Sequence, residues 1–186
     1  MAIIHHTTLK PTKLELLTGW LPKQPWYRGD GTPDLTKAGG FRLDDPAGAV
    51  GIEFMAVTDA SGPEPVTYHV PLTYRGAPLP DAPDDALIGT LVHGVLGDRW
   101  VYDGTRDPVL VAELTALLKG EVPAHAQSVD GALDETVRAR LDGADGRPEF
   151  VRVLEPGTTV PRGVTAEWQS GNGGRVSGVF VVVRGD

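Results

Sequence analysis

Two stretches of the chain carry apolar residues at helical spacing. The first covers residues 12–21, where Thr12 and Glu15 form the pattern of a capping box. Its apolar stripe consists of Leu14, Leu17 and Leu21. The second covers residues 107–119, which open on aspartate and proline and close on a lysine followed by glycine. The pattern predicts two main helices over these two ranges.

Elsewhere the apolar residues mostly recur at every second position, which is typical of strands with one buried face. The clearest pair covers residues 50–56 and 66–74, with a turn at residues 59–62 between them. Two further short strands are expected between residues 91 and 102. Pro71 has no backbone N–H, so it indicates an edge position or a bulge. The pattern predicts an antiparallel meander with one buried face and, with the two helices, an α+β fold.

Turn-forming residues mark the segments between these elements. Residues 28–40 and 76–86 are rich in glycine, aspartate and proline, so we expect both to be loops. A short strand is expected at residues 2–8, ahead of the first helix.

The C-terminal part of the chain sets the expected domain organisation. Residues 121–147 predict a linker that includes a weak helix at residues 133–141. Further strands are expected at residues 150–154, 164–168 and 176–183. The last of these is apolar on both faces near its end, which places it inside a sheet. We therefore expect residues 148–186 to complete the sheet of residues 1–120, giving a single domain over residues 1–186.

Composition and charge narrow the classes of function. The chain has 186 residues, enough for one ordinary domain, and its hydrophobic fraction of 40% is that of a globular protein. Its net charge of -8 disfavours both nucleic acids and anionic membrane surfaces as partners. It has no cysteine, no basic leader segment and no apolar run long enough for a membrane helix. These features favour a cytoplasmic protein. They leave the oligomeric state open, and a homo-oligomer is one of the alternatives.

Three groups of aromatic-rich motifs occur in a fixed order along the chain. They are Trp20-Leu21 with Gln24, Trp26-Tyr27 and Gly29; Tyr68-His69-Val70 with Tyr74; and Val101-Tyr102-Asp103 ahead of Asp107-Pro108. Over residues 10–118 this order resembles the N-terminal cap domain of maltokinases and the related glucosamine kinases. The resemblance implies a cystatin-like or monellin-like fold, in which a curved antiparallel sheet wraps on a helix.

No catalytic apparatus of a kinase follows these motifs. The chain has no glycine-rich phosphate loop, no Walker motif and no ordered set of catalytic aspartate, asparagine and metal-binding aspartate. His93 with Asp98 resembles a catalytic loop only superficially, and we interpret His93 as a turn or strand-end residue. The pairs Asp44-Asp45 and Asp84-Asp85 are typical of a turn and of a solvated loop. The sequence thus predicts no catalytic residue, no metal site and no cofactor.

Six residues are the candidates for binding: Trp26, Tyr27, Arg28, Arg42, Tyr74 and Arg75. Trp and Tyr dominate interface hot spots and also stack on sugar rings. For Trp26 the competing interpretation is that it folds back onto the sheet as part of the core. For Arg42 and Arg75 the competing interpretation is surface pairing with nearby acids.

Three hypotheses of function follow. The first is a non-catalytic cap-like module that interacts with another protein, a kinase or an enzyme of glycogen, trehalose or aminosugar metabolism. The second is a module that binds a sugar or metabolite on the concave face of the sheet. The third is an enzyme whose site forms at a homodimer interface.

Overall fold

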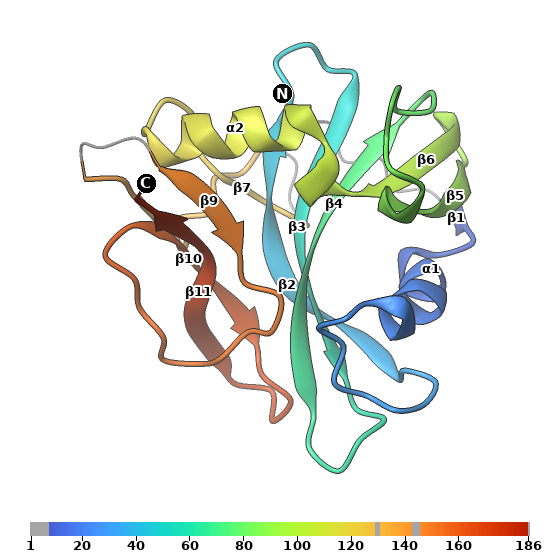
Figure 1. Cartoon of the computed structure of the whole chain (residues 1–186), viewed down its shortest axis with the longest axis horizontal. Helices are drawn as coiled ribbons and strands as arrows, with labels where there is room; N and C mark the ends of the chain where they lie inside the picture. The colour runs from blue at the N-terminus through green and yellow to red at the C-terminus, as the bar shows by residue number, and fades with distance from the viewer. Residues whose placement is uncertain (1–7, 129–130, 143–145, 186) are drawn as a thin grey trace.

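The computed structural model describes residues 8–128, 131–142 and 146–185. Within these residues the chain forms one open, antiparallel sheet of eleven strands with two α-helices (Figure 1). The helices are α1 (Lys13–Trp20) and α2 (Pro108–Leu118). The strands are β1 (Leu9–Lys10), β2 (Leu35–Asp44), β3 (Val50–Asp59), β4 (Val66–Arg75), β5 (Leu87–His93), β6 (Gly97–Asp103), β7 (His125–Ala126), β8 (Arg138–Arg140), β9 (Arg147–Phe150), β10 (Gly163–Gln169) and β11 (Arg175–Arg184). The α+β prediction is confirmed.

The order of strands joins the two ends of the chain in one sheet. It runs β1-β5-β6-β4-β3-β2-β10-β11-β9, with β7 pairing β2 and β8 pairing β10. In Figure 1 the long strands β2, β3 and β4 occupy the centre, with the β5–β6 hairpin on one side and β9–β11 on the other. The prediction that the C-terminal strands complete the main sheet is therefore confirmed.

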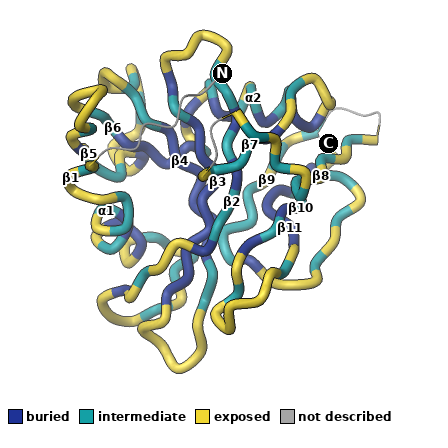
Figure 2. Tube along the Cα trace, turned by 180° about the vertical axis from the view of Figure 1, so that it is seen from behind, coloured by how far each residue is buried: buried dark blue, intermediate teal, exposed yellow. Residues whose placement is uncertain are grey.

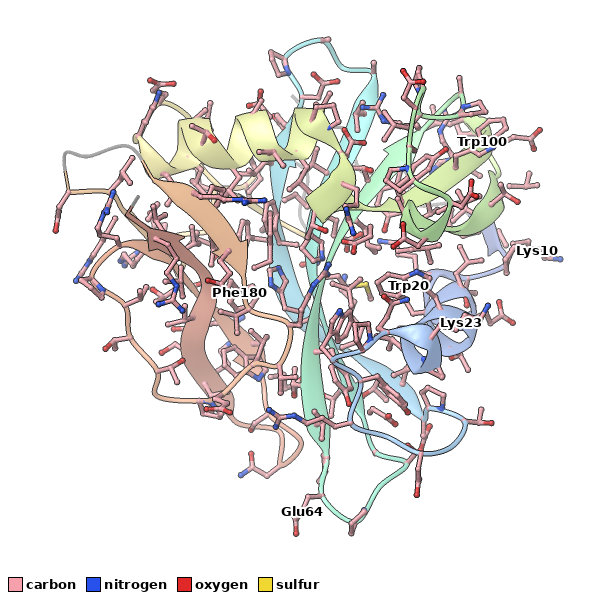
Figure 3. The ribbon with its side chains drawn as sticks, in the orientation of Figure 1. Lys10, Trp20, Lys23, Glu64, Trp100 and Phe180 are labelled. Carbon is pink, nitrogen blue, oxygen red and sulfur yellow. The ribbon has the colours of Figure 1, made fainter. Side chains whose placement is uncertain are left out.

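Both faces of the central strands are buried, where the sequence had predicted one. The register pairs Phe54 with Pro71, so the apolar positions of β3 and those of β4 point to opposite sides of the sheet. Phe54 and Ile52 pack in a core with α2, β10 and β11, whereas Tyr68 and Val70 pack in a second core with α1. Figure 3 labels Phe180 and Trp20, which belong to the first and the second core.

Both helices begin and end where their capping signals place them. Thr12 accepts a hydrogen bond from the Glu15 backbone N–H, and Glu15 accepts one from the Thr12 N–H, which completes the capping box. Asp107 caps α2 through the Val109 N–H. Gly120 follows α2 with a φ of 73°, a conformation that favours glycine.

The predicted loop at residues 28–40 is wrong in its second half, because β2 already begins at Leu35. A bulge between Lys37 and Gly39 interrupts the alternation of apolar residues that would have indicated a strand. Gly40 follows with a φ of 114°, and a Cβ atom there would lie 1.9 Å from the carbonyl oxygen of Phe54. Only glycine therefore allows the two strands to approach at this point.

The predicted weak helix at residues 133–141 is also wrong. Residues Arg138–Arg140 form strand β8, which pairs with β10. The reason is a period-two pattern in which Val137, Ala139 and Leu141 pack against the core while the arginines between them stay exposed.

The segment that follows β9 departs from the strand predicted at residues 150–154. The strand ends at Phe150, and the chain then crosses from β11 to β4. The His69 N–H donates to the Arg152 carbonyl and the Leu154 N–H to the Thr67 carbonyl, each within 2.9 Å. Pro71 lies in β4 between these bonds and the pairing with β6, which begins at Leu72. Its missing N–H therefore falls where the outer neighbour of β4 changes.

Two further expectations concern the ends of the chain and the membrane. The strand expected at residues 2–8 lies mostly outside the described residues. Within the described residues, the short strand ahead of α1 is β1. Neither described helix has the length and apolar character needed to span a bilayer.

Candidate functional site

The structure distributes the six candidate residues over four places and does not bring them into one site. Trp26 and Tyr27 lie against the α1 core, and Arg28 lines a groove beside them. Arg75 joins β4 to the start of α2. Arg42 and Tyr74 lie on the α1 face of the sheet, around a glutamate that the sequence analysis did not select.

Trp26 packs on the core through its aromatic neighbours. Its ring centroid lies 5.8 Å from that of Trp20 and 5.8 Å from that of Tyr68. The guanidinium carbon of Arg152 lies 4.9 Å from its ring centroid, within the range of a cation–π contact. The indole is partly buried in this arrangement, as the core-packing interpretation expects.

Tyr27 is held by both its ring and its hydroxyl. The ring centroid lies 5.5 Å from that of Tyr68, and the hydroxyl donates to Asp59 at 2.8 Å. Partial burial, followed by the contact with Asp59, raises the pKa of Tyr27 to about 12. Tyr27 is therefore neutral at physiological pH and serves as a hydrogen-bond donor.

Arg28 lies at the rim of a groove with a volume of about 230 Å³. Its backbone N–H donates to the Tyr68 hydroxyl at 2.9 Å, which fixes the main chain of the loop. The wall includes Trp168 and Val153, and its polar side chains besides Arg28 include Thr67, Glu155 and Ser170. The groove is open and mixed in character, and it does not concentrate groups of one chemistry.

Arg75 forms a two-pronged ion pair with Asp107. Its Nε and Nη2 atoms donate to the two carboxylate oxygens, both at 2.7 Å. Asp107 is fully buried, and its carboxylate also caps α2. Burial alone would raise the pKa of Asp107, and the hydrogen bonds from Arg75 reverse this effect, so the pKa is lowered overall. The Arg75 side chain thus links β4 to the N-terminus of α2.

Tyr74 belongs to a polar network centred on Glu53, and Arg42 lies beside this network. Glu53 is 3% exposed, yet its carboxylate accepts three hydrogen bonds. The donors are Lys13 Nζ at 2.6 Å, the Tyr74 hydroxyl at 2.6 Å and Gln127 Nε2 at 2.9 Å. Arg42 lies directly opposite Glu53 on β2. A signal for this network exists in the sequence, because Glu53 interrupts an otherwise apolar strand.

Electrostatics keep Glu53 ionised inside the fold. Burial by itself would raise the pKa of its carboxyl group, but the charge of Lys13 and the hydrogen bonds from Lys13 and Tyr74 lower it to about 2. Burial, followed by the charge of Glu53 and the hydrogen bond to it, raises the pKa of Tyr74 well above its ordinary value. The network therefore combines a fixed carboxylate with a neutral phenol.

The β5–β6 hairpin carries an exposed apolar surface. Leu87, Val92, Val95 and Leu96 are four of the five large hydrophobic residues that are exposed within the described part of the chain. Val95 is 63% exposed and Val92 is 53% exposed, so neither side chain is part of the buried core. Figure 2 shows that buried residues concentrate in the central strands, whereas much of this hairpin is exposed. We call these four residues the apolar hairpin surface.

The contacts at these places are ion pairs, hydrogen bonds and aromatic packing that support the fold. Among the described residues, no group of three or more histidines, aspartates and glutamates is arranged to hold a metal ion. His93 ends β5, and its Nδ1 atom accepts hydrogen bonds from the Val95 and Leu96 N–H groups at 3.2 and 3.1 Å. It thus shapes the hairpin turn, as the turn interpretation of this residue expects.

Comparison with known proteins adds the family. No curated protein matches the chain. The model of the maltokinase N-terminal cap domain matches residues 20–107, from the last residue of α1 to the N-cap of α2. The match includes the aromatic loop, the central meander and the β5–β6 hairpin. Residues 20–107 of this chain therefore match the maltokinase N-terminal cap domain family.

Proposed function

We propose that the chain is a non-catalytic cap-type module of the cytoplasm that binds another protein, a kinase or an enzyme of glycogen, trehalose or aminosugar metabolism. The family is named for a domain of maltokinases, which relates this module to kinases and to sugar metabolism. The observation that carries the proposal is the apolar hairpin surface, where four exposed large hydrophobic side chains lie on one hairpin.

The strand edge beside these residues supports the same proposal. On its outer side, β5 pairs in the described residues with β1 alone, through Val92 and His93. An edge strand with free backbone groups and exposed apolar side chains is a ready template for another chain. The proposed partner therefore contacts both the edge of β5 and the tip of the hairpin.

The surrounding charges indicate the chemistry of the partner. These charges are of both signs. Just ahead of β5, Asp85 lies 3.8 Å from Arg106, and in β6 Asp98 is followed by Arg99. A contact surface with an apolar centre and a rim of both charges would complement this arrangement.

We expect the double substitution Val95→Asp, Leu96→Asp to weaken partner binding at least about tenfold, because charges in the centre of an interface cannot be desolvated cheaply. The partner is first captured from native cell extract, and binding is then measured between purified proteins. Leu133→Asp is the matched control, since Leu133 is 57% exposed and lies outside the hairpin. If a purified enzyme of sugar metabolism binds the double variant as tightly as the wild type, the proposed surface is wrong.

We expect the purified chain to release no ADP from ATP above background when maltose or glucosamine is supplied. The reason is that the motifs needed to bind and transfer a phosphoryl group are missing from the 186 residues. A coupled ADP assay with an active maltokinase as positive control makes the measurement. Sugar-dependent ADP release at a rate that scales with protein concentration would contradict the non-catalytic proposal.

A further inference from the structure

Three cations gather on the α1 face of β2 and β3, in a chain with a net charge of -8. We call Lys13, Lys37 and Arg42 the cationic cluster. Lys13 lies 2.6 Å from Glu53, and Arg42 lies opposite Glu53 in the β2–β3 register. Lys37 interacts electrostatically with Glu53, with Lys13 and with Arg42. The three positive charges therefore lie around one carboxylate.

Of the three cations, only Lys13 donates a hydrogen bond to Glu53. Its two oxygens already accept hydrogen bonds from one lysine, one tyrosine and one glutamine. Within the described residues, no hydrogen bond or ion pair engages the side chains of Lys37 or Arg42. The other nearby acid is Asp44, two residues along β2 from Arg42, and it lies 3.6 Å from His125. Among the described residues of this region, three cations thus accompany these two carboxylates.

The pKa of Lys37 is consistent with these neighbouring charges. Partial desolvation of its ammonium group lowers the pKa first, and the carboxylate of Glu53 raises it. The positive charges of Lys13 and Arg42 then lower it again. An anion placed between Lys37 and Arg42 would relieve this repulsion.

We propose that the cationic cluster binds a small phosphate-bearing ligand, with Arg42 and Lys37 contacting the phosphate oxygens. A guanidinium group binds two phosphate oxygens at once, and an ammonium group adds a point charge. The Glu53 network fixes Lys13 and Gln127 beside them, so that part of the site is formed before the ligand arrives. Lys37 is exposed and Arg42 is half-buried, which leaves the site open to solvent.

The cationic cluster lies on α1 and β2, whereas the apolar hairpin surface lies on β5 and β6. It goes beyond the proposed binding of a protein partner, and either inference can fail without the other.

The test is a titration of the full chain with inorganic phosphate, glucose 6-phosphate and glucose, followed by ¹H–¹⁵N NMR. Ionic strength is held constant with sodium chloride, because exposed charges also respond to general screening. The reporters are the Gly40 backbone amide and the Gln127 side-chain amide, which lie next to each other above the network. The variant is Lys37→Gln, Arg42→Gln. Its control is Lys119→Gln, Arg175→Gln, which removes the same charge from exposed positions elsewhere.

We expect saturable shifts of both reporters with inorganic phosphate and with glucose 6-phosphate, and none with glucose. We expect Lys37→Gln, Arg42→Gln to weaken the binding at least about tenfold, as the loss of two charge-assisted contacts implies. The control is expected to bind within a factor of about two of the wild type. A tighter fit of glucose 6-phosphate than of phosphate would assign the site to phosphosugars.

Three results would overturn the proposal. The first is a response of the wild type to phosphate that does not saturate or that spares both reporters. The second is an equal response to glucose and to glucose 6-phosphate. The third is equal binding by the wild type and by Lys37→Gln, Arg42→Gln.

Discussion

Replacing Arg75 by alanine is expected to lower the free energy of unfolding by about 3–5 kcal/mol, the cost of leaving a buried charge without its partner. Asp107 is fully buried, and both of its oxygens accept hydrogen bonds from Arg75 at 2.7 Å. Alanine cannot replace these donors, and the carboxylate stays buried because it also caps α2. Chemical denaturation followed by circular dichroism measures the change.

Two further variants separate the charge from the packing. Asp107→Asn in the Arg75→Ala background removes the unpaired charge and keeps an N-cap residue, so we expect it to recover most of the loss. Arg106→Ala is the matched control, because Arg106 lies 3.8 Å from Asp85 in an exposed pair. We expect it to change stability by less than about 0.5 kcal/mol. A double variant no more stable than Arg75→Ala would refute the role assigned to the Asp107 charge.

Stability is expected to fall as the pH drops from 6.5 towards 4.5, by up to about 1.4 kcal/mol per pH unit, because of His69. His69 is fully buried among the rings of Phe54, Phe150 and Phe180. Its Nδ1 atom donates to the Val151 carbonyl at 2.9 Å, across the seam between β4 and the segment after β9. Burial, followed by the positive charge of Arg152, lowers its pKa from 6.5 to about 3.

The sign follows from the two states of this histidine. Between pH 6.5 and 3 the unfolded chain binds a proton at His69 and the folded chain does not, so lower pH favours unfolding. The stabilising contribution is complete above pH 6.5 and is lost progressively below it. Glu53 acts in a lower window, because its pKa falls from 4.5 to about 2 on folding. The range from pH 6.5 to 4.5 therefore reports on His69 separately from Glu53.

The measurement is the free energy of unfolding at several pH values in the wild type and in His69→Asn. His69→Asn keeps a side-chain N–H near the Val151 carbonyl and removes the titration, so we expect a flatter dependence. In the folded wild type, NMR should find that the His69 ring stays neutral down to pH 4.5. A ring that titrates near pH 6.5, or equal slopes in wild type and His69→Asn, would refute the prediction.

Much of the fold could be predicted because its signals are local. The capping box at Thr12 and Glu15 and the Asp107-Pro108 start fixed both helices within one or two residues. The alternation in residues 50–56 and 66–74 identified β3 and β4. Strand β8 was missed because three residues at period two resemble a short irregular helix until a partner strand is known.

The candidate site could be predicted only in part. Aromatic content selected Trp26 and Tyr27, but their packing depends on Tyr68, in a strand far along the chain that no local pattern specifies. Arg75 and Asp107 were separate features in the sequence, and they form one ion pair only after α2 docks. Glu53 was overlooked because its strand was identified from the alternating apolar residues around it.

By itself the sequence determined the α+β class, the positions of both helices and the central meander, since caps, turn residues and hydrophobic periods act over a few neighbours. Only the tertiary structure decided that the apolar faces of β3 and β4 point in opposite directions, because that depends on the register between strands. The register between β2 and β3 places Arg42 opposite Glu53, and the docking of α1 brings Lys13 to Glu53. The cationic cluster is thus a product of strand pairing and helix docking, which bring together side chains that the sequence keeps apart.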